Sequence, residues 1–178
     1  MGPNIASEVT VSEDGSTITM TFPEGMYYAS GEQLEPEDVI ASMERIQKNS
    51  HFASQYATIT SMEADGRNVV FHVDHFDAGL YAGLAGSFCT VMDKAELDAK
   101  TNDELLWDCH PYGAYSVKEY VPGSHAVLQR NPAYVTHKPY VENKGAALIE
   151  EITIRKLVRI QLECGLKVAD YLREHLQA

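Results

Sequence analysis

Cysteine, basic residues and long apolar runs are all scarce in this sequence. Its 178 residues include three cysteines, an odd number without C-x-x-C spacing: Cys89, Cys109 and Cys164. This pattern argues against a disulfide scaffold and against a structural zinc site. No apolar run approaches the roughly 18 residues that a membrane-spanning helix needs. Residues 1–4 lack the basic and apolar regions of a signal peptide, so we expect no targeting segment in the chain as written.

Positive charge is the other shortage. The sequence has 14 Lys and Arg residues against 26 Asp and Glu residues, which gives a formal net charge of −12. An acidic surface repels phosphate backbones and anionic lipids, so nucleic acids and membrane surfaces are poor candidate partners. The hydrophobic share of 44% and the charged share of 22% are typical of globular domains. The chain is also long enough to bury a hydrophobic core without disulfide bonds.

Alternating apolar and polar residues on both sides of short turn sequences predict three β-hairpins. The hairpins cover residues 9–22, 60–73 and 114–130. Asp-Gly stands at the first two turns and Pro-Gly at the third. We expect the three hairpins to share one sheet system. A further strand is predicted over Leu148–Leu157, which is rich in isoleucine.

Helical spacing predicts two amphipathic helices. Pro36 and the acidic residues around it are typical of a helix start, and apolar residues then recur on one stripe as far as about Asn49. Residues 158–178 carry a second stripe, made of Leu162, Leu166, Ala169, Leu172 and Leu176. The remaining segments are a predicted short helix and buried strand in 76–92, a polar helix-capable connection in 93–106 and a turn-rich stretch in 130–145.

These elements together predict an α+β fold, with a mixed, mainly antiparallel sheet built from β-hairpins and with packed helices.

Several groups of residues could carry chemistry, and each has a simpler explanation. His72, Asp74 and His75 look like the start of a metal site, but only His72 and Asp74 share a strand face. Two ligands without a third make a poor metal site, so a solvated strand end explains them better.

Two further groups suggest catalysis only weakly. Cys109-His110 could be a nucleophile and its base, but adjacent side chains rarely face each other and no motif places an acidic residue to orient the histidine. Asp103, Glu104 and Asp108 could be carboxylates for sugar hydrolysis, but the solvated face of a connecting helix explains them better. We therefore predict no catalytic residue, no metal site and no cofactor.

Five motifs in a fixed order resemble a known family. "VTVSEDGSTITMTFPEGMYYASGEQLEPEDVIASMERI" contains a hairpin, a glycine turn and a helix, and "ATITSMEADGRNVVFHV" follows it. "YGAYSVKEYVPGSHAVLQRNPAYVTHKPYVEN" and "IEEITIRKL" complete the series. Together they are similar to family 5 of the bacterial extracellular solute-binding proteins, the peptide, nickel and oligosaccharide receptors of ABC importers. The resemblance runs from about Asn4 to Leu157.

The resemblance implies part of a periplasmic-binding-protein-II-like lobe. It assigns residues 1–105 to the small subdomain of the first lobe, residues 106–157 to strands of that lobe's main sheet, and residues 158–178 to a C-terminal amphipathic helix. It also implies a receptor rather than an enzyme. Such a receptor would work outside the cytoplasm, hold a peptide or similar small solute between two lobes, and dock on an ABC permease.

Two residues are candidate ligand contacts through this resemblance. "SHFASQY" matches a turn whose aromatic residue reaches the cleft in oligopeptide receptors, which places Phe52 there; a core aromatic at a helix exit is the alternative. "YGAY" matches a first-lobe segment and gives Tyr112, although Tyr112 stands where the family has a smaller polar residue.

The same resemblance leads us to expect a truncated piece of a longer receptor. Such a piece would bind peptide feebly, because a loss of about 4 kcal/mol weakens binding roughly a thousandfold. The alternative function is a structural or interaction domain, in which apolar surface and open strand edges bind a partner or a second copy. The C-terminal helix could instead cover that surface within the same chain.

Overall fold

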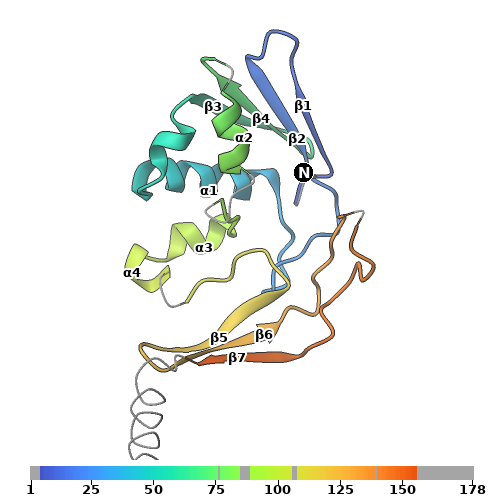
Figure 1. Ribbon diagram of the computed structural model, residues 1–178, viewed down its shortest axis with the longest axis vertical. Helices are drawn as coiled ribbons and strands as arrows, with labels where there is room; N and C mark the ends of the chain where they lie inside the picture. The colour runs from blue at the N-terminus through green and yellow to red at the C-terminus, as the bar shows by residue number, and fades with distance from the viewer. Residues whose placement is uncertain (1–4, 76, 85–88, 106–107, 139, 156–178) are drawn as a thin grey trace, which may run out of the picture.

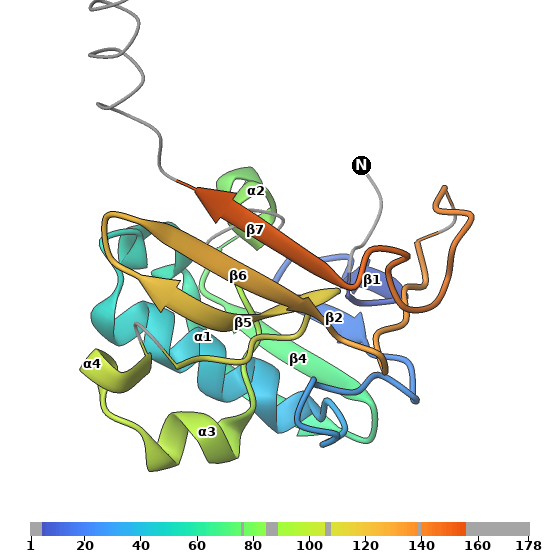
Figure 2. The same ribbon diagram turned by 90° about the horizontal axis from the view of Figure 1, so that it is seen from below.

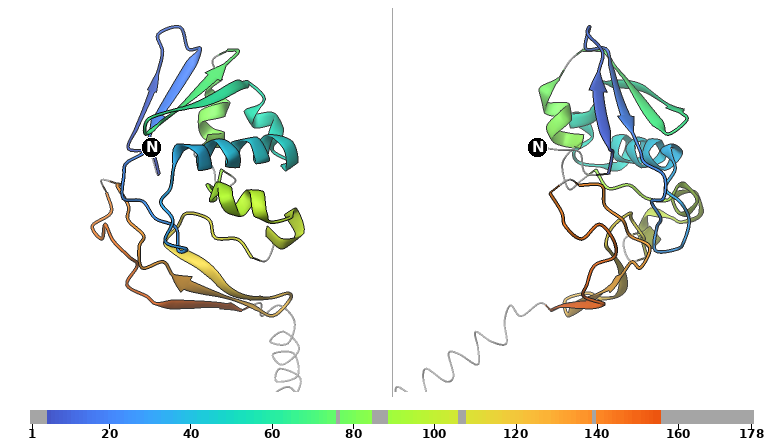
Figure 3. Two further views of the ribbon diagram at one scale, coloured as in Figure 1. Left: turned by 180° about the vertical axis from the view of Figure 1, so that it is seen from behind. Right: turned by 90° about the vertical axis from the view of Figure 1, so that its right-hand side faces the viewer.

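The computed structural model describes residues 5–75, 77–84, 89–105, 108–138 and 140–155. Among these residues, seven strands form two antiparallel sheets, with helices between them (Figures 1 and 3). The first sheet has the order β1-β2-β4-β3, with β1 at Glu8–Val11, β2 at Thr17–Thr21, β3 at Ile59–Asp65 and β4 at Asn68–Val73. The second has the order β5-β6-β7, with β5 at Tyr115–Val121, β6 at His125–Arg130 and β7 at Glu151–Arg155.

The first sheet joins two predicted hairpins through the pairing of β2 with β4, which sets Ile18 opposite Phe71. Both side chains are buried, as the period-two pattern predicts. Gly15 and Gly66 occupy the turns with positive φ, a conformation that favours glycine. In the first turn, Asp14 accepts hydrogen bonds from Ser12 and Ser16, and these hydrogen bonds lower the pKa of its carboxyl to about 2.

Helix α1 (Pro36–Asn49) packs its apolar stripe on this sheet through the buried side chains of Val39 and Met43. The helix begins at Pro36 and ends at Asn49, as predicted from the sequence. The 3₁₀-helix η1 (Ala53–Tyr56) follows, and then come α2 (Ala78–Leu84), α3 (Lys94–Ala99) and α4 (Asn102–Leu105) after the second hairpin. Buried side chains from the first sheet, α1 and the loop between them form the main hydrophobic core.

A buried carboxylate fastens α3 to the start of α1. Asp38 accepts hydrogen bonds from the Glu35 N–H at 2.8 Å, the Lys94 N–H at 2.8 Å and the Tyr28 hydroxyl at 3.2 Å. Burial raises the pKa of Asp38, and these hydrogen bonds oppose that effect. The two helix starts therefore share one acceptor, which satisfies backbone donors that have no partner within their own helices.

The expectation of one shared sheet system is wrong. The third hairpin forms β5 and β6, but these strands pair with each other and with β7, and not with the first sheet. The α+β class and the antiparallel hairpins are confirmed. The predicted strand at Leu148–Leu157 begins only at Glu151, and the described residues 89–92 of the predicted buried strand are irregular. The predicted helix at 158–178 lies outside the described residues.

Candidate functional site

Tyr112 lies in the connection between α4 and β5, where it links several segments. Its backbone N–H donates to the Val91 carbonyl at 2.9 Å, and its hydroxyl donates to the Val135 carbonyl at 2.7 Å. Its ring packs edge-on against Tyr28, with centroids 6.1 Å apart, and at a tilt against Tyr134, with centroids 5.5 Å apart. Burial raises the pKa of Tyr112 to about 12, so the phenol is neutral and can donate at physiological pH.

A cavity of about 140 Å³ lies beside this ring. The residues that line it come from the N-terminal segment, the loop before α1 and the turn-rich stretch after β6: Ile5, Met26, Tyr112, Gly113, Tyr134, Val135, Thr136, His137 and Lys138. Pockets that enclose a drug-sized ligand usually measure about 300–1,000 Å³. This cavity could therefore hold a side chain or a small group, but it is too small to enclose a whole peptide.

The walls of the cavity are held together by Asn131, which is only 1% exposed. Its amide nitrogen donates to the Tyr27 carbonyl at 3.1 Å and to the Gly113 carbonyl at 3.2 Å. Its amide oxygen accepts from the Ala133 N–H at 3.0 Å. One buried side chain thus connects the loop before α1, the segment before β5 and the stretch after β6.

Phe52 is not part of this cavity. It precedes η1, and it is 36% exposed, so the alternative reading of Phe52 as a core aromatic does not fit the structure. Phe52 and Tyr112 therefore belong to different parts of the fold, with Phe52 on the surface beyond α1 and Tyr112 buried next to the second sheet. Their roles as ligand contacts stay predictions.

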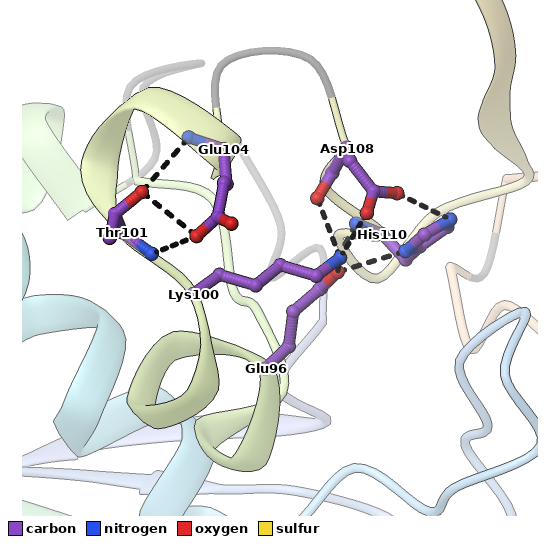
Figure 4. A network of polar contacts seen from close by, with 6 residues as sticks. All are labelled: Glu96, Lys100, Thr101, Glu104, Asp108 and His110. Carbon is purple, nitrogen blue, oxygen red and sulfur yellow. Dashed lines mark hydrogen bonds and ion pairs between the residues drawn. The ribbon is translucent and has the colours of Figure 1, made fainter.

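The sequence did not reveal a polar cluster around Glu96 (Figure 4). The Glu96 carboxylate accepts from Lys100 Nζ at 2.7 Å and contacts His110 Nδ1 at 2.9 Å. Lys100 also contacts Asp108 at 2.8 Å. The spacing of Glu96 and Lys100, four residues apart on a polar helical segment, is the one signal that could have indicated part of this cluster.

The cluster does not make Cys109 a nucleophile. Burial and the nearby Glu96 carboxylate raise the pKa of the Cys109 thiol, whereas a nucleophilic cysteine needs a lowered pKa. Elsewhere, His72 contacts Glu63 at 3.1 Å and His75 contacts Asp74 at 2.7 Å. Within the described part of the chain, no three His, Cys, Asp or Glu side chains are grouped so that they could hold a metal ion.

The Glu96 cluster predicts a specific pH dependence of stability. Burial raises the pKa of Glu96, but hydrogen bonds from Lys100 and His110 outweigh it, so the pKa is lowered overall. A lowered pKa adds stability above the ordinary glutamate pKa of 4.5, and that stability is lost as the pH falls through the folded-state value. Urea unfolding should show Glu96→Gln about 1–2 kcal/mol less stable than the parent chain at pH 6, with the difference shrinking below pH 4.

Asp98→Asn is the matched control for this prediction, because Asp98 lies on the same helix but is exposed, and among the described residues its ion pair is with Lys94. It should change the free energy of unfolding by less than about 0.5 kcal/mol at either pH. If the free energy of unfolding of Glu96→Gln differs from that of the parent chain by the same amount from pH 7 to pH 3, the result would contradict the assigned role of the carboxylate.

Cys89 should react unusually slowly with thiol reagents. Its Sγ lies 3.3 Å from Met43 Sδ, and burial raises its pKa to about 11. Because the thiolate is the reactive form, alkylation of Cys89 by iodoacetamide at pH 8 should be about a hundredfold slower than that of a free thiol. Peptide mass spectrometry measures the rate for each cysteine, with the chain in urea as control. A folded rate within threefold of the unfolded rate would contradict this prediction.

The sequence model of the bacterial extracellular solute-binding proteins, family 5 (middle region), matches residues 1–158. This chain belongs to that family. The family consists of solute-binding receptors of ABC importers, which are not enzymes and which work outside the cytoplasm. Among the described residues of this family 5 chain, no helix is both long and apolar enough to cross a membrane.

Solved structures with the same fold include NikA from Staphylococcus aureus in complex with Ni(L-His)2, with 20% identity, a TM-score of 0.70 and 85% of this chain covered. AppA from Bacillus subtilis, an oligopeptide-binding protein in complex with a nonapeptide, has 18% identity, a TM-score of 0.73 and 93% covered. DppA from Helicobacter pylori, in complex with the peptide STSA, has 18% identity, a TM-score of 0.71 and 95% covered. The family 5 chain described here spans 30%, 33% and 36% of these three chains, about a third of their length.

Proposed function

We propose that this chain forms part of the first lobe of a receptor that captures a peptide or a similar small solute for an ABC importer. The observation that carries this proposal is the family match over residues 1–158, which includes every described strand and helix. Two of the similar structures hold peptides and one holds Ni(L-His)2, which supports a peptide or a similar small solute as the ligand. The complete receptor would then dock on an ABC permease to deliver its ligand.

The size of the cavity supports a site shared between two lobes. A space of about 140 Å³ beside Tyr112 could take one side chain of a peptide, while the rest of the ligand would contact another lobe. In two-lobed receptors, hinge closure brings both halves of the site around the ligand and excludes water. Binding to one half alone loses the contacts of the other half, so affinity in the millimolar range is expected instead of micromolar.

An NMR titration of the chain with peptides of three to nine residues tests this function. We expect weak binding, with chemical-shift changes at Gly113, at residues 134–138 and near Phe52. Phe52→Ala should remove the changes near η1, while Tyr140→Ala, which alters a surface aromatic that is 68% exposed, should leave all of them in place. Shifts scattered over the whole surface, or micromolar affinity by calorimetry, would contradict the proposal of half a site.

A second candidate function is an interaction domain, which exposed apolar residues before and within β7 favour. Leu148, Ile149 and Ile154 are 87%, 59% and 55% exposed. Apolar surface of this kind tends to associate with a partner or a second copy. Light scattering tests self-association, because a chain that stays monomeric from micromolar to millimolar concentration would not use this surface to form oligomers.

A further inference from the structure

Strand β7 forms an open edge of the second sheet. Its one strand partner among the described residues is β6, and Figures 1 and 2 show β7 at the margin of the sheet. Four of its five residues are exposed: Glu151, Thr153, Ile154 and Arg155. An edge strand presents unpaired backbone N–H and C=O groups along one side, and another strand can bind there.

The pairing of β7 with β6 identifies the backbone groups on the open side. The Arg130 N–H donates to the Glu150 carbonyl at 2.8 Å, next to the first residue of β7. Hydrogen-bonded pairs alternate along an antiparallel ladder, so every second residue after Glu150 turns its N–H and C=O groups toward β6. The residues between them therefore turn these groups toward the open side: Glu151, Thr153 and Arg155.

The other edges of the two described sheets carry features that oppose strand addition. β3 has a bulge between Ile59 and Ser61, and β5 has one between Val117 and Glu119. A bulge bends an edge strand and interrupts its row of hydrogen-bonding groups. β1 has only four residues, and short edge strands also discourage pairing. β7 pairs with β6 without a register shift, so it is the edge best suited to a further strand.

We propose that β7 pairs antiparallel with β7 of a second copy of this chain, with the two Thr153 residues opposite each other on a two-fold axis. This register sets Glu151 opposite Arg155 of the second copy, and Arg155 opposite its Glu151. The open backbone groups of the two strands then face each other at all three positions, which allows about six hydrogen bonds. The inference rests on the second candidate function, self-association, and names its partner and its geometry.

The side chains of β7 are self-complementary in this register. Opposite charges meet at both ends of the pair, Ile152 faces Ile154, and threonine faces threonine. Charge pairs of opposite sign, pairs of branched side chains and Thr–Thr pairs all stabilise neighbouring strands. A shift of one residue would oppose open backbone groups to groups that already bind β6. A shift of two residues would set a charged side chain against Thr153 and break the charge pairs.

The two charged residues are accessible for this contact. The Glu151 side chain is 45% exposed, and its Oε2 contacts Lys118 Nζ at 2.7 Å, which leaves Oε1 for a second cation. Arg155 is exposed and has no ion pair with another residue in the described ranges. The net charge of −12 makes two copies repel each other, and the paired edge is small. We therefore expect a weak dimer, with a Kd of about 0.1–1 mM.

The assembly should stop at two copies. A two-fold axis uses the same edge of both chains, so the pair leaves no β7 edge open. The combined sheet would then end in β5 on both sides, where the bulge opposes further addition.

Amide hydrogen exchange of the full chain tests the pairing without any substitution. The amides of Glu151, Thr153 and Arg155 should exchange several-fold more slowly at about 1 mM chain than at about 10 μM, because they donate to the second copy only in the dimer. The amides of Ile152 and Ile154 donate to β6 in either state and should change less. An alternating pattern of this kind is specific to edge pairing.

Charge reversal tests the register. Glu151→Arg and Arg155→Glu should each weaken dimerisation about tenfold in analytical ultracentrifugation, because each sets like charges opposite each other twice. An equimolar mixture of the two variants should recover the parental affinity, because every charge then faces its opposite. Glu119→Arg, which changes an exposed residue on the β5 edge of the same sheet, is the matched control and should dimerise like the parent chain. Amide exchange of β4 reports whether each variant is folded.

The outcomes separate this inference from both proposed functions. A parent chain that stays monomeric at millimolar concentration, with no slowing of β7 amide exchange, would overturn the inference and the second candidate function, whereas the receptor function depends on the peptide titration. A dimer whose affinity is unchanged by both charge variants, or is not restored in their mixture, would overturn the inference alone. Alternating protection together with recovery in the mixture supports it.

Discussion

Arg67→Ala should lower the free energy of unfolding by about 3 kcal/mol, one of the two largest effects that we expect of a single substitution in this chain. The Arg67 guanidinium donates to the carbonyl oxygens of Phe22 at 3.2 Å, Pro23 at 2.9 Å and Leu34 at 3.0 Å. It also forms an ion pair with Glu35 at 2.5 Å. Its removal would leave carbonyl groups without a donor where the loop enters α1, and each unsatisfied buried group costs about 1–3 kcal/mol.

Arg67→Lys should recover less than half of this loss. An ammonium group is compact and lacks the planar fork that reaches several carbonyl groups at once. Arg45→Ala is the matched control, because Arg45 donates to Asn102 on the surface, which is its one side-chain hydrogen bond within the part of the chain that the structure describes. Urea denaturation of the three variants at pH 7 measures the differences. Equal stability of the Arg67→Ala and Arg45→Ala variants would contradict the assigned role of Arg67.

Asn131→Ala should lower the free energy of unfolding by about 2–4 kcal/mol, for a different reason. The substitution removes two donors and one acceptor from a side chain that is almost completely buried. The carbonyl groups of Tyr27 and Gly113 would then lose their shared donor, which joins the loop before α1 to the segment before β5. Amide exchange in the segment 111–114 should therefore accelerate more than exchange in β4.

Asn131→Asp and Asn143→Ala complete this experiment. The aspartate keeps the acceptor oxygen but replaces both donors with a buried negative charge, so it should destabilise the fold at least as much as alanine. Asn143 makes comparable local hydrogen bonds, to Ala146 and Gly145, but on the exposed side of the same stretch. Its replacement by alanine should cost less than about 1 kcal/mol. A similar cost at both asparagines would show that Asn131 does not join the two parts.

The candidate site could be predicted from the sequence only in part. Tyr112 was identified through its resemblance to a family motif, and the structure places it in a cavity wall. Asn131, which holds that wall together, gave no signal, because its partners are backbone carbonyls up to 104 residues away in the chain. The sequence also gives no signal that His110 has an acidic partner. Glu96 lies 14 residues earlier, and only folding brings the two side chains together.

Local sequence patterns are enough to predict the three hairpins with their turns, the limits of α1 at Pro36 and Asn49, and the family to which the chain belongs. Periodicity and turn chemistry depend on residues a few positions apart, so they can be read along the chain. The pairing of the third hairpin with β7, in a sheet separate from the first, becomes visible only in the folded chain. The choice of partner strand depends on side-chain packing and backbone hydrogen bonds between distant segments, which local patterns do not encode.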